Sequence, residues 1–159
     1  MKKMNNKGFS LVELIIVIAI MAILIVVLAP QYLKYVEKSR NSTDLQSATE
    51  FRDACEVWAS DPDAPDATAF KNTGTSPEIV VKFETGGANI TAGAAQVQAA
   101  LENAGLSTSK LKCMSKTRWT SFTITGDVES NGSIDWSYTN TKGGTADGTN
   151  SFAKAMGEE

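Results

Sequence analysis

The chain lacks histidine altogether, and its 159 residues include only two cysteines, Cys55 and Cys113. Histidine is the commonest general base near neutral pH and a frequent metal ligand, so its absence argues against both kinds of site. No phosphate-binding glycine loop, nucleophile elbow or cluster of metal ligands occurs either. The composition therefore disfavours an enzyme, and we expect no cofactor and no metal.

Basic side chains are also scarce, with 15 Lys and Arg against 18 Asp and Glu and a net charge of −3. Without residues 1–8, three lysines leave and the balance becomes 12 against 18, a net charge of −6. Phosphate repels such a domain, so we expect no direct binding of nucleic acid by the monomer.

The two cysteines leave two interpretations open. An exported domain can keep a disulfide between Cys55 and Cys113. Alternatively, both are small buried apolar residues, because free cysteine is among the most buried residue types.

Charge is missing entirely from Leu14 to Ala29, while Lys2, Lys3 and Lys7 precede this run. A plain signal anchor of roughly 20 residues fits that pattern, whereas the apolar run is long for a secretory signal peptide. Neither explains Glu13, because a carboxylate in a membrane helix is costly and usually has a function.

Cleavage between Gly8 and Phe9 explains more. It would create an α-amino group on Phe9, four residues before Glu13. In a helical assembly of identical subunits, the carboxylate of one copy can meet the amine of its neighbour. Such a pair offsets the cost of burying each charge and fixes the register of the helices.

The residues KGFSLVELIIVIAIMAIL, from Lys7 to Leu24, closely resemble the class III signal of type IV pilins and their pseudopilin relatives. The resemblance covers residues 1–40 and implies cleavage after Gly8, N-methylation of Phe9 and an assembly role for Glu13. It also implies a prepilin peptidase and methyltransferase, an assembly platform with motor ATPases, and a homopolymer. The chain would sit in the cytoplasmic membrane as a single-pass protein before it enters an extracellular filament.

Pro30 stands where the family carries a helix-kinking proline. A proline removes a backbone hydrogen bond, so it can end a helix or bend it. The apolar pattern resumes at once with Tyr32 and Leu33. We therefore expect a bend inside one long helix.

Residues 31–60 predict the amphipathic continuation of that helix, which ends near Ser60. Polar residues, Asp44 among them, are assigned to the outer face. Side chains three or four apart form one apolar stripe that is expected to pack on a sheet: Leu45, Ala48, Phe51, Cys55 and Trp58.

Residues 61–77 predict a surface loop, in which the prolines argue against calcium binding by Asp61, Asp63 and Asp66. We expect a strand at 78–85 and a short helix at 91–105. Asn131-Gly132 predicts a hairpin turn, after which three residues alternate on a face that packs on the helix: Ile134, Trp136 and Tyr138. The tail from Lys142 either docks on the sheet edge or stays loose.

The fold class expected is α+β: a long N-terminal helix whose hydrophobic half projects and whose second half packs on an antiparallel sheet. Its segments are a cleaved leader (1–8), a membrane and filament-core half-helix (9–30), an amphipathic half-helix (31–60) and a globular head (61–159). The function implied is that of a major pilin of a type IV pilus, used in adhesion, aggregation or twitching motility. A pseudopilin of a secretion or DNA-uptake system and a monomeric membrane-anchored domain are the alternatives.

Overall fold

The computed structural model describes residues 8–65, 68–74, 76, 78–149 and 151–157. It divides into two compact units, an N-terminal unit of Met1–Lys38 and a C-terminal unit of Ser39–Glu159. The long helix α1 (Leu11–Ala59) contributes to both. Of the predicted leader, only Gly8 lies among the described residues.

Helix α1 contains Pro30 without interruption, so the predicted continuation of the helix past this residue is confirmed. The helix ends at Ala59, one residue before the predicted end at Ser60. Thus a single helix carries both the uncharged run and the amphipathic stripe.

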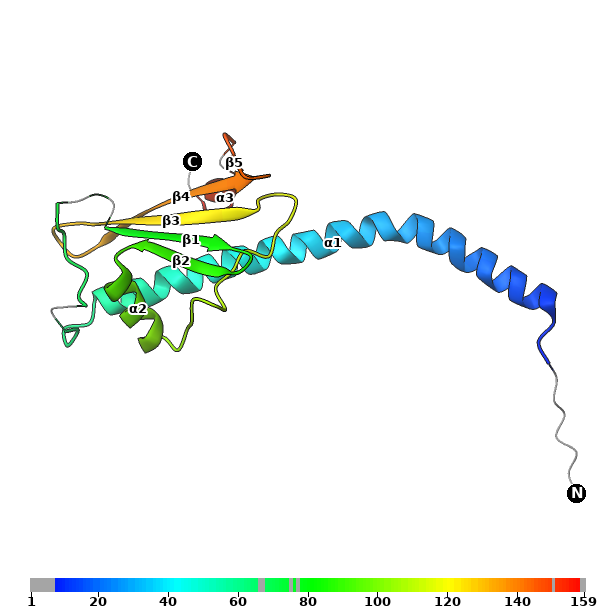
Figure 1. Ribbon diagram of the computed structural model, residues 1–159, viewed down its shortest axis with the longest axis horizontal. Coiled ribbons are helices and arrows are strands. Elements are labelled where there is room, and N and C mark those ends of the chain that lie inside the picture. The colour runs from blue at the N-terminus through cyan, green and yellow to red at the C-terminus, as the bar shows by residue number, and fades with distance from the viewer. Residues whose placement is uncertain (1–7, 66–67, 75, 77, 150, 158–159) are drawn as a thin grey trace, which may run out of the picture. The chain divides into compact units, whose positions relative to one another are not determined.

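The C-terminal unit holds a five-stranded antiparallel sheet in the order β2-β1-β3-β4-β5 (Figure 1). Its strands are β1 (Ile79–Glu84), β2 (Gly87–Ala92), β3 (Ser121–Val128), β4 (Ile134–Lys142) and β5 (Thr145–Ala146). Two short helices, α2 (Ala94–Asn103) and α3 (Ser151–Met156), complete it. The expected α+β arrangement of a long N-terminal helix with an antiparallel sheet is confirmed.

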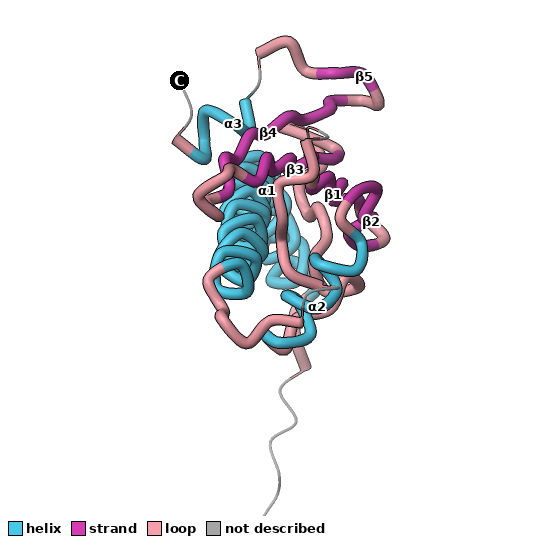
Figure 2. The backbone as a smooth tube through the Cα atoms, turned by 90° about the vertical axis from the view of Figure 1, so that its left-hand side faces the viewer, coloured by secondary structure: helices cyan, strands magenta, loops and turns pink. Residues whose placement is uncertain are grey.

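The core of the C-terminal unit lies between one face of the sheet and the part of α1 that follows residue 38 (Figure 2). Ala48, Phe51 and Cys55 are fully buried there, and Leu45 and Trp58 pack at the margin. The rings of Phe51 and Phe83 meet edge to face, with centroids 5.5 Å apart. The predicted apolar stripe is therefore confirmed.

The predicted hairpin joins β3 to β4, with Gly132 at a φ of 86° in the turn. Beyond it, Tyr138 is buried, and the ring of Trp136 contacts Phe51 edge to face with centroids 6.0 Å apart. Alternate β4 residues therefore face α1, as the alternation predicted.

The helix expected at 91–105 begins later, at Ala94, and strand β2 takes the preceding residues, including Thr91 and Ala92. Strand β2 was not predicted from the sequence, because its residues, GANITA, show no regular alternation of apolar side chains. The change from strand β2 to helix α2 depends instead on the backbone geometry at Gly93. A Cβ on Gly93, whose φ is 69°, would lie 2.8 Å from the carbonyl oxygen of Glu78. Glycine there permits the close turn from strand to helix.

The C-terminal tail docks on the sheet edge. Strand β5 pairs with β4, and α3 buries Phe152 and Ala153. The ring of Phe152 stacks on Phe122 with centroids 4.1 Å apart. Of the two expectations for this tail, docking is the one observed.

Candidate functional site

The N-terminus of α1 is closed by a reciprocal cap that the sequence analysis missed. The Ser10 hydroxyl accepts the backbone N–H of Val12 at 3.3 Å. The backbone N–H of Ser10 in turn donates to Glu13 Oε2 at 2.9 Å. This is a capping box, and its signal was present as S-x-x-E in residues 10–13. Within a single chain, Glu13 therefore has a partner one turn back along its own helix.

Apolar side chains cover the whole N-terminal half of α1. From Leu11 to Leu28, the large apolar side chains are between 42% and 73% exposed, and Phe9 is 85% exposed. Burying one such side chain is worth about 1.5–3 kcal/mol. The helix is long and apolar enough to cross a membrane by length and composition. Lipid or other apolar helices must cover this surface in a stable state.

The predicted processing residues, Gly8 and Phe9, are both exposed just before the helix. Their cleavage and methylation stay predictions, as do the assembly roles of Phe9, Glu13 and Pro30. The structure places Glu13 on the first turn of the exposed apolar segment.

Asp44 corrects the sequence analysis, which assigned it to the polar face of the helix. The residue is fully buried. It accepts the backbone N–H groups of Met114 (2.6 Å) and Ser115 (2.9 Å) and the indole N–H of Trp119 (2.7 Å). Its position explains the error, because it precedes Ala48 by four residues and so continues the apolar stripe. The four-residue spacing from Ala48 predicts the buried face for Asp44, and only its charge led to its assignment to the polar face.

The two cysteines are buried free thiols in this structure. Burial, followed by the charge of Glu56, raises the pKa of Cys55 to about 12, which keeps it protonated. Cys113 Sγ lies 3.6 Å from Asp44 Oδ2. Asp44 precedes Cys55 by eleven residues, about 16 Å along a helix. A disulfide needs Cα atoms within about 7 Å, so the structure does not bring the pair together.

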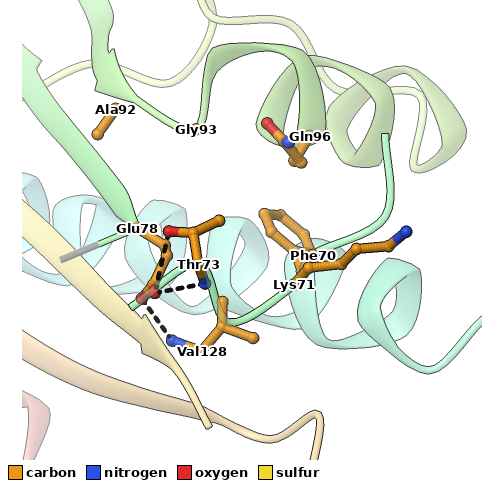
Figure 3. Close-up of a pocket in the computed structure, with 8 residues that line it drawn as sticks. All are labelled: Phe70, Lys71, Thr73, Glu78, Ala92, Gly93, Gln96 and Val128. Carbon is orange, nitrogen blue, oxygen red and sulfur yellow. Dashed lines mark hydrogen bonds between the residues drawn. The ribbon is translucent and has the colours of Figure 1, made fainter. Parts of the chain in front are cut away.

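A hollow of about 270 Å³ opens where α2, the end of β3 and residues 70–73 meet (Figure 3). Its carboxylate, Glu78, accepts the backbone N–H groups of Thr73 (3.2 Å) and Val128 (3.0 Å). These bonds, that from Val128 first, hold the pKa of Glu78 below its usual range. Lys71 extends away from Glu78. Glu78 thus ties the loop to the sheet.

Within the described ranges, no group of three Cys, Asp or Glu side chains is placed to hold a metal ion. Asp61 instead accepts the backbone N–H of Asp63 at 2.9 Å, a local turn contact. The third aspartate of this loop, Asp66, lies outside the described residues.

Comparison with known proteins singles out the same N-terminal segment. Residues 3–29 match the family model for the prokaryotic N-terminal methylation motif. A type IV major fimbrial protein, FimA, of Dichelobacter nodosus is 39% identical over 59 residues, which are 37% of this chain and 38% of that protein. A probable minor fimbrial protein of the same organism is 33% identical over 99 residues, 54% of this chain and 61% of that protein.

The chain spans less than two thirds of the length of either relative. No solved structure matches the chain significantly. The methylation motif, the two fimbrial relatives and the α+β arrangement nevertheless agree with one another. They support the resemblance predicted from residues 7–24, and the N-terminal segment of this chain is similar to that of type IV fimbrial proteins.

Proposed function

We propose that this protein is a structural subunit, specifically the major pilin, of a type IV pilus. The observation that carries the proposal is the exposed apolar helix surface from Phe9 to Leu28 with Glu13 on its first turn. The methylation motif and the similarity to fimbrial proteins support it. In this proposal the chain is not an enzyme and works by polymerising.

Processing would change the partner of Glu13. Cleavage after Gly8 leaves a charged amine on Phe9, next to the Ser10 N–H that now occupies Glu13 Oε2. The capping bond satisfies the carboxylate while the subunit waits in the membrane. In the filament, the amine of a neighbouring copy offers a stronger, charge-assisted partner in an apolar surrounding. Glu13 therefore selects subunits that have been cut and that lie in register.

The proposed life history has two locations. The subunit first spans the cytoplasmic membrane through residues 9–30, with Pro30 bending the helix. There it meets the prepilin peptidase and methyltransferase and the assembly platform with its motor ATPases. Residues 31–60 and the head (61–159) then face outward in an extracellular filament. Adhesion, aggregation or twitching motility would be the use of that filament.

The first experiment is mass spectrometry of the protein sheared from intact cells. The expected result is an N-terminal peptide that begins at Phe9 and carries one added methyl group, in a high-mass fraction. An N-terminal peptide that begins at Met1, found only in membranes, would overturn the proposal. It would leave a monomeric membrane-anchored domain as the better account.

The variant Glu13→Gln sharpens this test. The amide oxygen still accepts the Ser10 N–H, so the helix cap and insertion are kept, while the charge is lost. We expect normal processing with a loss of at least about tenfold in sheared filament, as for the loss of a desolvated charge pair. Ser10→Ala, which removes only the capping hydroxyl, is the matched control and should assemble.

A pseudopilin of a type II secretion or DNA-uptake system is the second candidate, because the methylation motif does not by itself separate the two uses. The fimbrial relatives favour the pilus. Processed protein that never reaches the sheared fraction would favour the pseudopilin.

A further inference from the structure

A strap of chain outside the helices and strands, defined as residues 110–118, joins α2 to β3, and exposed and buried residues alternate in it from Lys110 to Lys116. Leu111, Cys113 and Ser115 are buried, whereas Lys110 and Lys112 between them are exposed. Lys116 and Arg118 are exposed as well. Four basic side chains thus stand on one short strap. No acidic residue occurs in the sequence between residues 103 and 126.

Hydrogen bonds to α1 and β1 fix the backbone of the strap. Asp44 holds its Met114 and Ser115 N–H groups, and the N–H of Cys113 donates to the carbonyl of Glu84 at 3.0 Å. The guanidinium of Arg118 lies over the ring of Trp119, 5.1 Å from its centroid. The nearby carboxylate of Glu84 pairs with Lys82 at 2.7 Å. The backbone of the strap is therefore held in place before any partner arrives, which lowers the entropy cost of binding.

Acidic residues gather at the end of the sheet that is opposite to the strap. The strand register sets Asp127 directly beside Asp135, and Glu56 accepts the indole N–H of Trp136 at 2.9 Å. Helix α1 also ends here, with no basic residue in its last turn, so the negative end of its dipole adds to the field. We call this the acidic end and define it by six residues: Glu56, Asp61, Asp63, Asp127, Glu129 and Asp135.

A hollow lies at the acidic end, and its one lining carboxylate, Glu56, pairs with Arg52 at 3.4 Å. The hollow has a volume of about 330 Å³ and opens beside the end of α1, lined by Glu56, Ser60 and the hairpin residues Gly132 and Ser133. Along β3, from Ser121 to Asp127, it lies about 20 Å from the strap. The two charged surfaces therefore stand at opposite ends of one rigid sheet, where they attract different copies and not each other.

We infer that the basic strap of one copy docks on the acidic end of the next copy. This rests on the proposed function, since the partner is another subunit of the filament. A contact between two different surfaces of identical chains repeats head to tail, and it generates an open helical filament when the rotation between copies does not close a ring. Nucleic acid is the weaker partner for the strap, because residues 39–159 carry ten basic against sixteen acidic side chains. The same chain already supplies the complementary surface.

The test is a charge swap in the full chain, expressed in cells that assemble the wild-type filament. One variant is Lys110→Glu with Lys112→Glu, the second is Glu129→Lys with Asp135→Lys, and the third combines all four. Each changed side chain is exposed, so folding and N-terminal processing should be kept. Lys112→Glu alone is compared with Lys154→Glu, an exposed charge change on α3.

We expect each two-residue variant to lower sheared filament about tenfold, because like charges then face each other, and the combined variant to restore it. Lys154→Glu should assemble as the wild type does. Unchanged assembly in both two-residue variants, or losses that the combination fails to restore, would overturn the inference. A strap reversal that spares assembly but abolishes DNA retention by sheared filaments would also overturn it and assign the strap to nucleic acid.

The two proposals fail differently in this experiment. If the wild-type chain is not cut at Gly8 or forms no filament, the proposed function fails. If the wild type is cut and assembles while the strap variants assemble equally well, only the docking contact fails.

Discussion

The carboxylate of Asp44 joins α1 to the strap through two backbone N–H donors and the thiol of Cys113, and it also accepts the indole N–H of Trp119. Hydrogen bonds to a charged acceptor are worth more than neutral ones, and a buried donor left without a partner carries a full desolvation cost. One side chain thus fixes both the strap and the indole of Trp119. Asp44 should therefore contribute more to the free energy of unfolding than any exposed carboxylate of the C-terminal unit.

Asp44→Asn should therefore destabilise the C-terminal unit by about 3 kcal/mol, since the amide nitrogen would face N–H donors without accepting from them. Thermal unfolding of the full chain in detergent, followed by circular dichroism, measures the change. Asp135→Asn, an exposed carboxylate of β4, is the control and should shift stability by less than about 0.5 kcal/mol. Equal shifts in the two variants would show that Asp44 contributes nothing special.

Residue types and spacing allowed the apolar stripe to be predicted but not the place of Asp44. Phe51 and Cys55 are apolar and recur at helical spacing, so their burial follows from the pattern. The burial of Asp44 depends on N–H donors about seventy residues away in the chain. Spacing within one helix contains no information about such partners. Ser10 differs, because both halves of its cap lie within four residues, where a local motif could have shown them.

At the scale of elements, the carboxylate of Asp147 helps to hold the short helix α3 to β4. Asp147 accepts the hydroxyl and backbone N–H of Thr149, the amide of Asn140 (3.0 Å) and the hydroxyl of Ser151 (2.9 Å). These bonds, that from the Thr149 hydroxyl first, hold the pKa of Asp147 well below its ordinary value. The folded state therefore prefers the ionised form. Its contribution is complete above the ordinary pKa of an aspartate and is lost as the pH falls toward the lowered folded pKa.

Asp147→Asn should loosen α3 at neutral pH, because the amide nitrogen cannot accept from Thr149, Asn140 or Ser151. We expect amide exchange in Ser151–Met156 to quicken by roughly tenfold, while the central strands keep their protection. Hydrogen exchange read by mass spectrometry of the full chain resolves the two regions. In the wild type, lowering the pH below the ordinary aspartate range should have the same local effect. Uniform exchange changes across the sheet would contradict this assignment.

Elements were predictable where one local signal dominates. Asn131-Gly132 and the alternation of Ile134, Trp136 and Tyr138 predicted the β3–β4 hairpin. Strand β2 was missed because pairing with β1, and not its own pattern, makes it a strand. The docked tail was left open for the same reason, since Phe152 alone shows no periodicity and its place depends on the aromatic rings of the sheet.

At the scale of the whole molecule, exposed apolar surface is divided sharply between the two units. Among the described residues, nineteen of the twenty-one exposed large apolar side chains belong to the N-terminal unit. The C-terminal unit contributes only Val57 and Met114 and has a core of its own. The exposed apolar surface therefore belongs to the N-terminal unit, whereas the basic strap and the acidic end belong to the C-terminal unit.

This division predicts that a chain reduced to residues 39–159 will be soluble and monomeric, with cooperative unfolding. Its sheet and the second part of α1 keep their mutual contacts, and the surface that needs lipid or neighbouring helices is gone. Exposed ion pairs are worth only about 0–1 kcal/mol each, so the strap and the acidic end cannot hold copies together at micromolar concentration without the apolar helices. Sedimentation velocity of the shortened chain beside the full chain in detergent tests this. A stable oligomer of the shortened chain would place the main assembly energy in the C-terminal unit, and an unfolded product would show that its core depends on the N-terminal half of α1.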